Sequence, residues 1–221
     1  IPVVNNRASN NSAVAEHTVG LIISGLRRIP LGDRELRSRD YAEVQTQFRS
    51  EGIHELSSQH VGIVGMGAIG QEVARMLAPF GCRMSYYDAF RPSAEREKEL
   101  NISYMDLENI IKECDIITLH VPVLPDTINM IGEKQLSMMK KNAFLVNTSR
   151  GEVIDQEALV KALENGDIFG AALDTVTPEP APKDHPFFKL SKQAADRLIL
   201  SPHIAGTTSE AFTRMLQWTI D

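Results

Sequence analysis

The most constraining feature of this chain is a short apolar run that ends in three regularly spaced glycines. Residues 61–64 lead into Gly65, Gly67 and Gly70, which have the spacing Gly-x-Gly-x-x-Gly. Apolar residues at helical spacing come next, and a second β-like run, 82–87, then ends in Asp88. This order predicts a strand, a glycine turn, a helix and a second strand with an acid at its tip. The alternative, a glycine-rich turn used only for packing, leaves the position of that acid unexplained.

Each part of this order has a separate role in binding a dinucleotide. Gly65 allows a tight turn, Gly67 lets the backbone approach the pyrophosphate, and Gly70 allows close packing of helix and strand. The helix N-terminus offers free N–H groups to phosphates. Asp88 is placed to accept hydrogen bonds from ribose hydroxyls and to repel a 2′-phosphate, so we predict NAD rather than NADP. Arg91 either weakens that preference or is a solvated loop cation, and we favour the second interpretation.

The composition indicates a folded protein and disfavours several classes of partner. Hydrophobic residues make up 43% of the 221 residues, which is enough to build a core. The net charge of −6 and the lack of any long basic cluster disfavour nucleic acid and membrane surfaces as partners. Cys82 and Cys114 lack metal-ligand spacing, so we expect no metal site and two reduced thiols in a cytoplasmic protein. We find no apolar run of membrane-spanning length and no signal peptide.

From residue 58 onward, apolar runs of strand length alternate with helical patterns. Short, continuously apolar strands separated by helices predict a parallel sheet that is covered on both faces. We therefore predict an α/β fold with a doubly wound parallel sheet. Asp106 and Asp155 are predicted helix caps, and Asn165-Gly166 a helix stop. The predicted strands are 60–64, 82–87, 102–104, 115–121, 143–147, 169–173 and 198–201.

The segments on either side of this alternation have different patterns. Residues 1–5 resemble the tail of a strand, and 13–29 are predicted to form a helix with Gly25 at a close-packing position. The polar stretch 31–57 is expected to be an extended arm or linker. Residues 207–210 contain a capping box, formed by Thr207 and Glu210, for a final helix. We expect the chain to be a segment of a longer protein with three parts: 1–57, 58–206 and 207–221.

Three polar residues follow predicted strands, at the edge where open α/β sheets bind ligands. Arg150 can grip a carboxylate with two parallel hydrogen bonds, and His203 can give or take a proton near neutral pH. Glu179 beside that histidine would orient it and favour its protonated form. The set suits reduction of an α-keto acid by hydride from NADH. Taken singly, the three could instead be a surface cation, a helix cap and an exposed loop charge.

Other polar residues have less definite roles in the sequence. Asp174 follows a predicted strand and either contacts the nicotinamide end of the cofactor or starts a turn. His17 and His120 lie within a predicted helix and a predicted strand, which favours structural roles for both.

With its glycine motif and the segments around Arg150, Glu179 and His203, the sequence resembles the D-isomer-specific 2-hydroxyacid dehydrogenases. This family includes phosphoglycerate, glycerate and D-lactate dehydrogenases. Segments matching the family's motifs extend over nearly the whole chain: 15–18, 65–70, 120–122, 147–151, 172–174 with 179–180, and 201–206. The resemblance implies that Arg150, Glu179 and His203 are the catalytic residues. It also implies NAD contacts at Gly65, Gly67, Ala68, Ile69, Gly70, Asp88, Val121, Pro122, Thr148, Ser149, Arg150, Asp174, His203, Ala205 and Gly206.

The resemblance also implies parts that this sequence does not contain. Members have a flavodoxin-like substrate domain, and its first portion is absent here, which leaves flanking helices from a truncated domain. Residues 31–57 loosely resemble the arm through which many members dimerise, so we expect a homodimer. The expected small-molecule partner is a 2-keto or 2-hydroxy acid of the lactate, glycerate or phosphoglycerate type. Closure of the missing portion excludes water, so we expect this chain alone to bind NAD and turn over poorly.

Two alternatives remain open within the same resemblance. Some members are corepressors that retain the catalytic residues, so an NAD-sensing interaction module is the second hypothesis. Nucleotide-dependent capture of a partner without keto-acid reduction would favour that module. Formate and phosphite dehydrogenases share the scaffold; Glu179 disfavours formate, and phosphite stays open.

Overall fold

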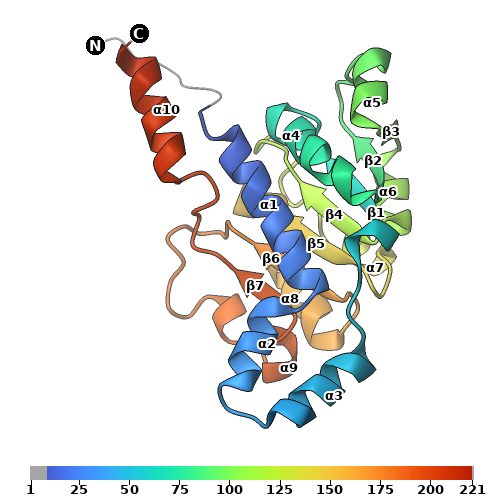
Figure 1. Cartoon of the computed structure of the whole chain (residues 1–221), viewed down its shortest axis with the longest axis vertical. Helices are drawn as coiled ribbons and strands as arrows, with labels where there is room; N and C mark the ends of the chain where they lie inside the picture. Colours follow the sequence, from blue (N-terminus) through green and yellow to red (C-terminus); the bar gives the residue numbers. More distant parts are fainter. Residues whose placement is uncertain (1–8, 221) are drawn as a thin grey trace.

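A computed structural model describes residues 9–220 of the chain, with side chains described for 9–217. Its centre is a sheet of parallel strands in the order β3-β2-β1-β4-β5-β6-β7 (Figure 1). The strand expected at 1–5 lies outside the described residues. All seven other predicted strands are confirmed, each within two residues: β1 (His60–Val64), β2 (Arg83–Tyr87), β3 (Ser103–Tyr104), β4 (Ile116–Leu119), β5 (Phe144–Asn147), β6 (Gly170–Leu173) and β7 (Leu198–Leu200).

The central strands are continuously apolar because both of their faces are covered by helices. Every residue of β1, β4, β5 and β6 is buried. Along β5, Phe144 and Val146 pack into the core on one face, whereas Leu145 packs into the core on the other. This alternation within an unbroken apolar run is the expected property of a parallel sheet between two helix layers. The prediction of a doubly wound α/β fold is confirmed.

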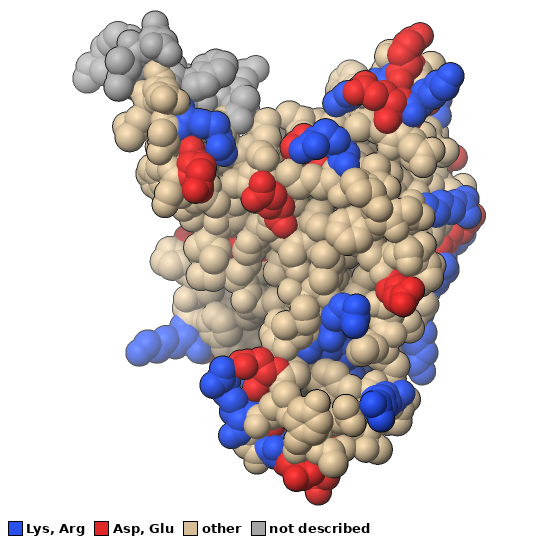
Figure 2. Space-filling view, in the orientation of Figure 1, with Lys and Arg blue, Asp and Glu red and all other residues tan. Residues whose placement is uncertain are grey.

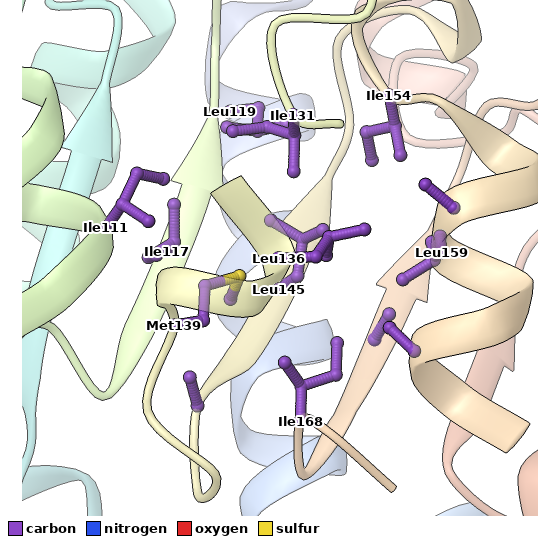
Figure 3. Packing of buried hydrophobic residues seen from close by; sticks show 14 of the residues in the cluster. Ile111, Ile117, Leu119, Ile131, Leu136, Met139, Leu145, Ile154, Leu159 and Ile168 are labelled. Carbon is purple, nitrogen blue, oxygen red and sulfur yellow. The ribbon is translucent and has the colours of Figure 1, made fainter. Parts of the chain in front are cut away.

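Two groups of helices form these layers. On one face lie α1 (Asn11–Leu26) and α4 (Ala68–Leu77). The core on the other face, drawn in Figure 3, receives side chains from α6 (Leu107–Glu113), α7 (Glu133–Met138) and α8 (Gln156–Asn165). A Cβ added at Gly25 would lie 2.1 Å from the ring of Phe144, so this glycine does let α1 pack closely on the sheet.

Residues 31–57 differ from our expectation of an extended arm. They contain most of α2 (Ile29–Leu36) and all of α3 (Tyr41–Glu51). Asp40 caps α3 by accepting hydrogen bonds from the N–H groups of Ala42 and Glu43. These two helices lie at the lower end of the molecule in Figure 1, and Figure 2 shows charged side chains of both signs gathered there. Capping and local ion pairs therefore stabilise surface helices where the sequence shows only polarity.

The helix predicted over 13–29 ends at Leu26, because Arg28 is left-handed and Ile29 begins α2; other predicted boundaries agree better. Asp155 caps α8 by accepting from the N–H of Ala158, and Gly166 ends the helix in the left-handed conformation. Asp106 is the N-cap residue of α6, but its side chain makes no capping hydrogen bond. The capping box was wrong by one residue: Thr208 accepts from the N–H of Ala211 and caps α10 (Ser209–Ile220).

The remaining elements are short: α5 (Ala94–Leu100), α9 (Lys192–Ala195) and the 3₁₀ helices at Leu56–Ser58, Ala78–Phe80, Gly151–Val153 and Pro186–Phe188. Among the residues described, none of the helices has the length and apolar character needed to cross a membrane.

Candidate active site

The glycine turn lies where the strand order changes direction. β1 pairs with β2 on one side and β4 on the other, so the carboxyl ends of β1 and β4 are adjacent. This switch point is where open α/β sheets bind ligands. Gly65 has φ +97°, and a Cβ there would lie 2.5 Å from the carbonyl oxygen of His120 and 3.0 Å from Val121. Only glycine fits this turn.

The other two glycines of the motif differ in what surrounds them. A Cβ at Gly70 would lie 2.0 Å from the carbonyl oxygen of Gly65, so α4 packs directly on the turn. Gly67 is exposed and has open space where a Cβ would be. It precedes Ala68 and Ile69 in the first turn of α4, and its helix N-terminus has no capping bond from any side chain that the structure describes. The free N–H groups beside an open space fit a pyrophosphate.

Asp88 lies beside this turn, as the sequence predicts. Its Oδ2 accepts a hydrogen bond of 2.5 Å from the N–H of Met66, and its Oδ1 accepts one of 2.8 Å from Phe90. These two bonds hold the carboxylate at the end of β2, next to the residues between the glycines. Its contact with a ribose stays a prediction.

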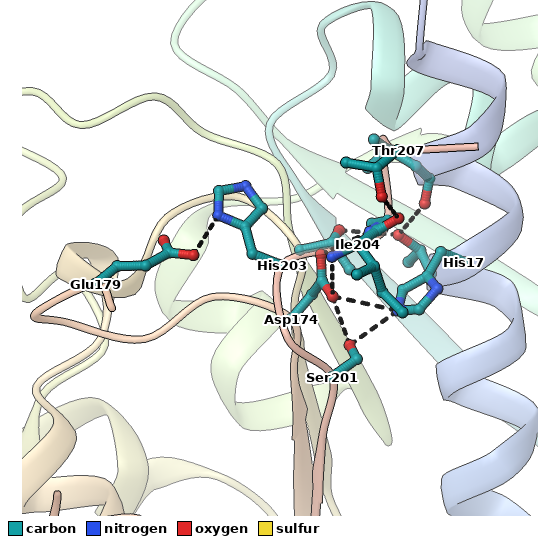
Figure 4. Close-up of polar contacts among 11 residues, drawn as sticks. His17, Asp174, Glu179, Ser201, His203, Ile204 and Thr207 are labelled. Carbon is teal, nitrogen blue, oxygen red and sulfur yellow. Dashed lines mark hydrogen bonds and ion pairs between the residues drawn. The ribbon is translucent and has the colours of Figure 1, made fainter. Parts of the chain in front are cut away.

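Glu179 and His203 meet on the surface at the same edge of the sheet (Figure 4). His203 Nδ1 lies 2.6 Å from Glu179 Oε1, and each side chain is 42% exposed. Glu179 comes from the proline-rich loop after β6, whereas His203 follows β7. The structure therefore brings together two residues that are 24 positions apart.

The backbone that presents His203 is held by Asp174. His203 has φ 52°, a left-handed conformation that carries a strain of about 1–3 kcal/mol for a residue with a side chain. Its N–H donates to the carbonyl oxygen of Asp174 at 2.8 Å. The next two N–H groups, of Ile204 and Ala205, donate to the two carboxylate oxygens of Asp174 at 3.1 and 3.0 Å. Three consecutive bonds to one residue stabilise the strained loop.

Asp174 is itself buried in a polar cluster with Ser201 and His17, which Figure 4 shows on the side of His203 away from Glu179. Ser201 donates to Asp174 Oδ1 at 2.5 Å, and His17 Nε2 lies 2.9 Å from Ser201 Oγ and 3.5 Å from Asp174 Oδ1. Burial raises the pKa of Asp174, but the hydrogen bonds from His17, Ser201 and the backbone hold that pKa well below its usual range. The carboxylate is thus occupied in holding the loop.

Arg150 is positioned by Asn147, the last residue of β5. The side-chain amide of Asn147 donates to the carbonyl oxygen of Arg150 at 2.8 Å, and its Oδ1 accepts from the N–H and Oγ of Ser149. Arg150 is exposed, and its guanidinium donates to the Ser149 carbonyl oxygen at 2.7 Å. It contacts neither Glu179 nor His203 in this structure, so convergence of the three residues stays a prediction.

The other predicted cofactor residues line the same edge with different degrees of exposure. Val121 is half-buried and Pro122 exposed after β4. The Thr148 hydroxyl is bonded to Thr18 of α1 at 2.9 Å. Ala205 is buried, and a Cβ at Gly206 would meet the side chain of Asn10 at 2.5 Å. Thr148 and Gly206 therefore lie against Thr18 and Asn10, so this edge of the sheet contacts α1 and the residue before it. The sequence does not indicate these contacts.

The sequence favours structural roles for His17 and His120, and the structure shows the partners of both. His120 Nε2 lies 2.9 Å from Thr118 Oγ1, and burial lowers the pKa of His120 to about 3. His17, together with Ser201, anchors Asp174; no local sequence pattern indicates this role, because His17 and Ser201 are 184 positions apart. Over the described part of the chain, no group of three or more His, Cys, Asp or Glu residues is placed to hold a metal ion.

Comparison with known proteins agrees with this geometry. Among curated proteins, a glyoxylate reductase of Korarchaeum cryptofilum is 40% identical over 217 residues, which cover 98% of this chain and 63% of that protein. A D-isomer specific 2-hydroxyacid dehydrogenase of Lactobacillus delbrueckii, solved in its NAD-complexed form, has a TM-score of 0.84 and 34% identity, over 99% of this chain and 67% of that one. The apo D-mandelate dehydrogenase of Rhodotorula graminis has a TM-score of 0.88 at 29% identity, over 97% and 61%.

The chain thus spans about three-fifths of the glyoxylate reductases that it matches, at 63% for that of Korarchaeum cryptofilum. Residues 19–205 match the family described as D-isomer specific 2-hydroxyacid dehydrogenase, NAD binding domain. That range contains the glycine turn, Asp88 and the Glu179–His203 pair. The chain belongs to the D-isomer specific 2-hydroxyacid dehydrogenase family and carries its NAD-binding domain, with NAD as the cofactor.

Proposed function

We propose that the whole protein, of which this chain is the cofactor-binding portion, reduces a 2-keto acid to a D-2-hydroxy acid with NADH. The observation that carries the proposal is the 2.6 Å contact between His203 and Glu179 at the sheet edge that also holds the glycine turn. A histidine paired with a carboxylate beside a dinucleotide site suits proton transfer coupled to carbonyl reduction. When bound, NADH supplies the hydride.

In this proposal, His203 is the acid that protonates the carbonyl oxygen. Its Nδ1 faces Glu179, so Nε2 is the ring atom left to face a substrate. The carboxylate of Glu179 accepts from Nδ1–H, which fixes the ring orientation and the ring nitrogen that keeps its hydrogen. After Nε2 gives up its proton, the neutral ring keeps the hydrogen on Nδ1. In the oxidation direction, the same Nε2 accepts the proton of the hydroxy acid.

Arg150 is proposed to bind the substrate carboxylate. Its guanidinium is exposed, and the bond to the Ser149 carbonyl leaves further N–H groups for a two-pronged contact. Asn147 fixes the backbone on which it stands. We also propose the division into 1–57, 58–206 and 207–221, with the first and last parts joining a substrate domain of the whole protein.

We further propose that the protein is a homodimer that assembles through α2 and α3. These helices lie at one end of the molecule, beyond the sheet (Figure 1), and expose Ile29, Leu36 and Tyr41 at 54%, 45% and 65%. Light scattering would give twice the chain mass for the parent. Replacing Ile29 and Leu36 by Ser would shift the mass toward a single chain; a parent with the mass of one chain would contradict this proposal.

A cytoplasmic location is proposed from the cysteines. Cys82 and Cys114 are both free and buried, and burial raises the pKa of the Cys114 thiol to about 12. Unpaired thiols of this kind are typical of reducing compartments. Fractionation of cells that express the protein would test this, and recovery from a secreted or membrane fraction would contradict it.

The decisive experiment uses the longer protein encoded by the gene. NADH absorbance is followed with pyruvate, glyoxylate, hydroxypyruvate and 3-phosphohydroxypyruvate. We expect one or more of these to be reduced, with a D-hydroxy product by chiral chromatography. NADH binding without reduction of any of the four would contradict the proposal and favour the interaction module. Capture of a protein partner only in the presence of NADH would then identify that module.

A further inference from the structure

Arg91 is exposed, as its loop context favours, but its guanidinium also lies against an aromatic ring. It lies three residues after Asp88, in the loop beyond β2, and its guanidinium carbon lies 3.5 Å from the centre of the Tyr104 ring. Tyr104 belongs to β3 at the edge of the sheet and is in register with Tyr86 of β2. A guanidinium that close to an aromatic ring is held by a cation–π contact as well as by stacking.

The neighbours of this contact also favour a cation at that place. The Tyr86 and Tyr104 rings meet edge to face, with centres 5.6 Å apart. The Tyr86 hydroxyl donates to the carboxylate of Glu97 on α5, which adds a negative group beside the two rings. Arg91 is therefore drawn toward the β3 edge, although it is close in sequence to Asp88.

Asp88 has its own partners and needs no cation. Both carboxylate oxygens accept backbone N–H groups, from Met66 and Phe90, and Arg91 forms no ion pair with it. In dinucleotide folds, an acid at the end of the second strand bonds the ribose 2′-hydroxyl, whereas a nearby arginine accommodates a 2′-phosphate. This chain has both residue types three positions apart, so which of them faces the ribose depends on where Arg91 is held.

We propose that Tyr104 is a specificity-determining residue for the cofactor, because its ring holds Arg91 away from the position of a 2′-phosphate. NADP is then disfavoured twice: the charge of Asp88 repels the phosphate, and the nearest arginine is not available to bind it. Tyr104 acts through Arg91 and does not itself contact the cofactor. The proposal concerns the NAD site only, so its test needs no turnover and is independent of the proposed reductase activity.

The test measures NADH and NADPH dissociation constants of the 221-residue chain by nucleotide fluorescence. An Asp88→Ser parent is used first, since removal of the carboxylate brings NADPH binding into a measurable range. In that parent, Tyr104→Leu should release Arg91 and raise NADPH affinity about two- to fivefold, the range of an exposed cation–π contact. NADH affinity should not change. An equal change for both nucleotides, or none for NADPH, would overturn the proposal.

Two control substitutions separate this role from a structural one. Tyr104→Phe keeps the ring face and removes only the hydroxyl, which donates to Asp106 at 3.2 Å, so it should leave both affinities at the parent values. Adding Arg91→Gln to Tyr104→Leu should remove the gain for NADPH.

Arg91→Gln alone, with Tyr104 intact, should leave NADPH affinity unchanged, because the arginine is already held elsewhere. A clear loss of NADPH affinity in that variant would show that Arg91 binds the phosphate despite Tyr104 and would overturn the proposal. Since Arg91 is exposed, this variant decides the question even where Tyr104→Leu does not fold.

Discussion

Asp174 and Glu179 are two carboxylates on the same edge of the sheet, yet their surroundings are opposite. Asp174 is 2% exposed, and its carboxylate interacts with Ser201, His17 and two backbone N–H groups. The Glu179 side chain is 42% exposed and, among the described residues, its carboxylate is bonded to His203 alone. The chain thus places one acid where its hydrogen-bonding capacity is used internally, and the other where it stays accessible.

The difference shows how this edge separates positioning from chemistry. We call His17, Asp174 and Ser201 the anchoring group, and Glu179 with His203 the exposed pair. A buried charge with all its bonds satisfied resists movement, since loss of any partner leaves a group unpaired in a region of low dielectric. The anchoring group can therefore hold His203 in its strained conformation, while the exposed pair stays free to exchange protons with a ligand.

The glycine turn also has one buried and one exposed position, Gly70 and Gly67. Substitutions at these two positions should show the largest difference in the free energy of unfolding. Gly70→Ala places a Cβ 2.0 Å from a backbone oxygen, so we expect the free energy of unfolding to fall by about 3 kcal/mol or more. Gly67→Ala meets nothing within 4 Å and should change that free energy by less than about 1 kcal/mol, while the added methyl group weakens NADH binding. Urea unfolding and NADH fluorescence would measure both. Equal losses of stability would break the contrast.

The two carboxylates themselves provide the next test. Asp174→Asn removes a charge that accepts from Ile204 and Ala205, and should lower the free energy of unfolding by about 2–3 kcal/mol. Glu179→Gln, the matched control, should change it by no more than about 0.5 kcal/mol. Both values come from urea titrations at pH 7. If Glu179→Gln destabilised the fold as much as Asp174→Asn, the exposed pair would also be structural.

His120 is another group held inside the fold, and its effect on the free energy of unfolding depends on pH. Its pKa is about 3 in the folded chain, against about 6.5 unfolded, so its contribution to stability is complete above pH 6.5. As pH falls below 6.5 the unfolded chain takes up a proton that the folded chain does not. Stability should therefore fall between pH 6.5 and 3, on the order of 1 kcal/mol per pH unit.

The matching variant for this pH test is His120→Asn, which keeps a hydrogen-bonding side chain and cannot be protonated. The free energy of unfolding is measured from pH 7.5 to 5 for both proteins. The parent should lose stability relative to the variant over this range. Parallel curves would show that His120 takes up its proton in the folded chain as readily as in the unfolded chain.

The sequence predicts the parts of the fold that depend on local pattern. Strands such as β4 and β5 are found because burial on both faces requires unbroken apolar runs, and α8 because Asp155 and Gly166 mark its ends. The helix α3 is missed because Val44 is its one buried residue, and α2 because its eight residues are too few for an apolar pattern to repeat. Asp40, which caps α3, was the available signal for that helix.

The candidate site, like the fold, is predictable from the sequence only where it depends on local pattern. Glu179 and His203 are found because polar residues after parallel strands gather at one edge. The bond of Ser201 to His17 joins residues 184 positions apart, and no local pattern encodes it. The same holds for Arg91 on Tyr104, where the register of two strands brings a loop cation to an edge ring.

The most direct test of the account compares NADH binding with turnover for His203→Gln in the longer protein. If the exposed pair performs the proton transfer and the anchored edge binds the cofactor, kcat for keto-acid reduction should fall about 100-fold or more. The dissociation constant of NADH should stay within about twofold of the parent value. Unchanged turnover, or loss of NADH binding together with activity, would contradict the account.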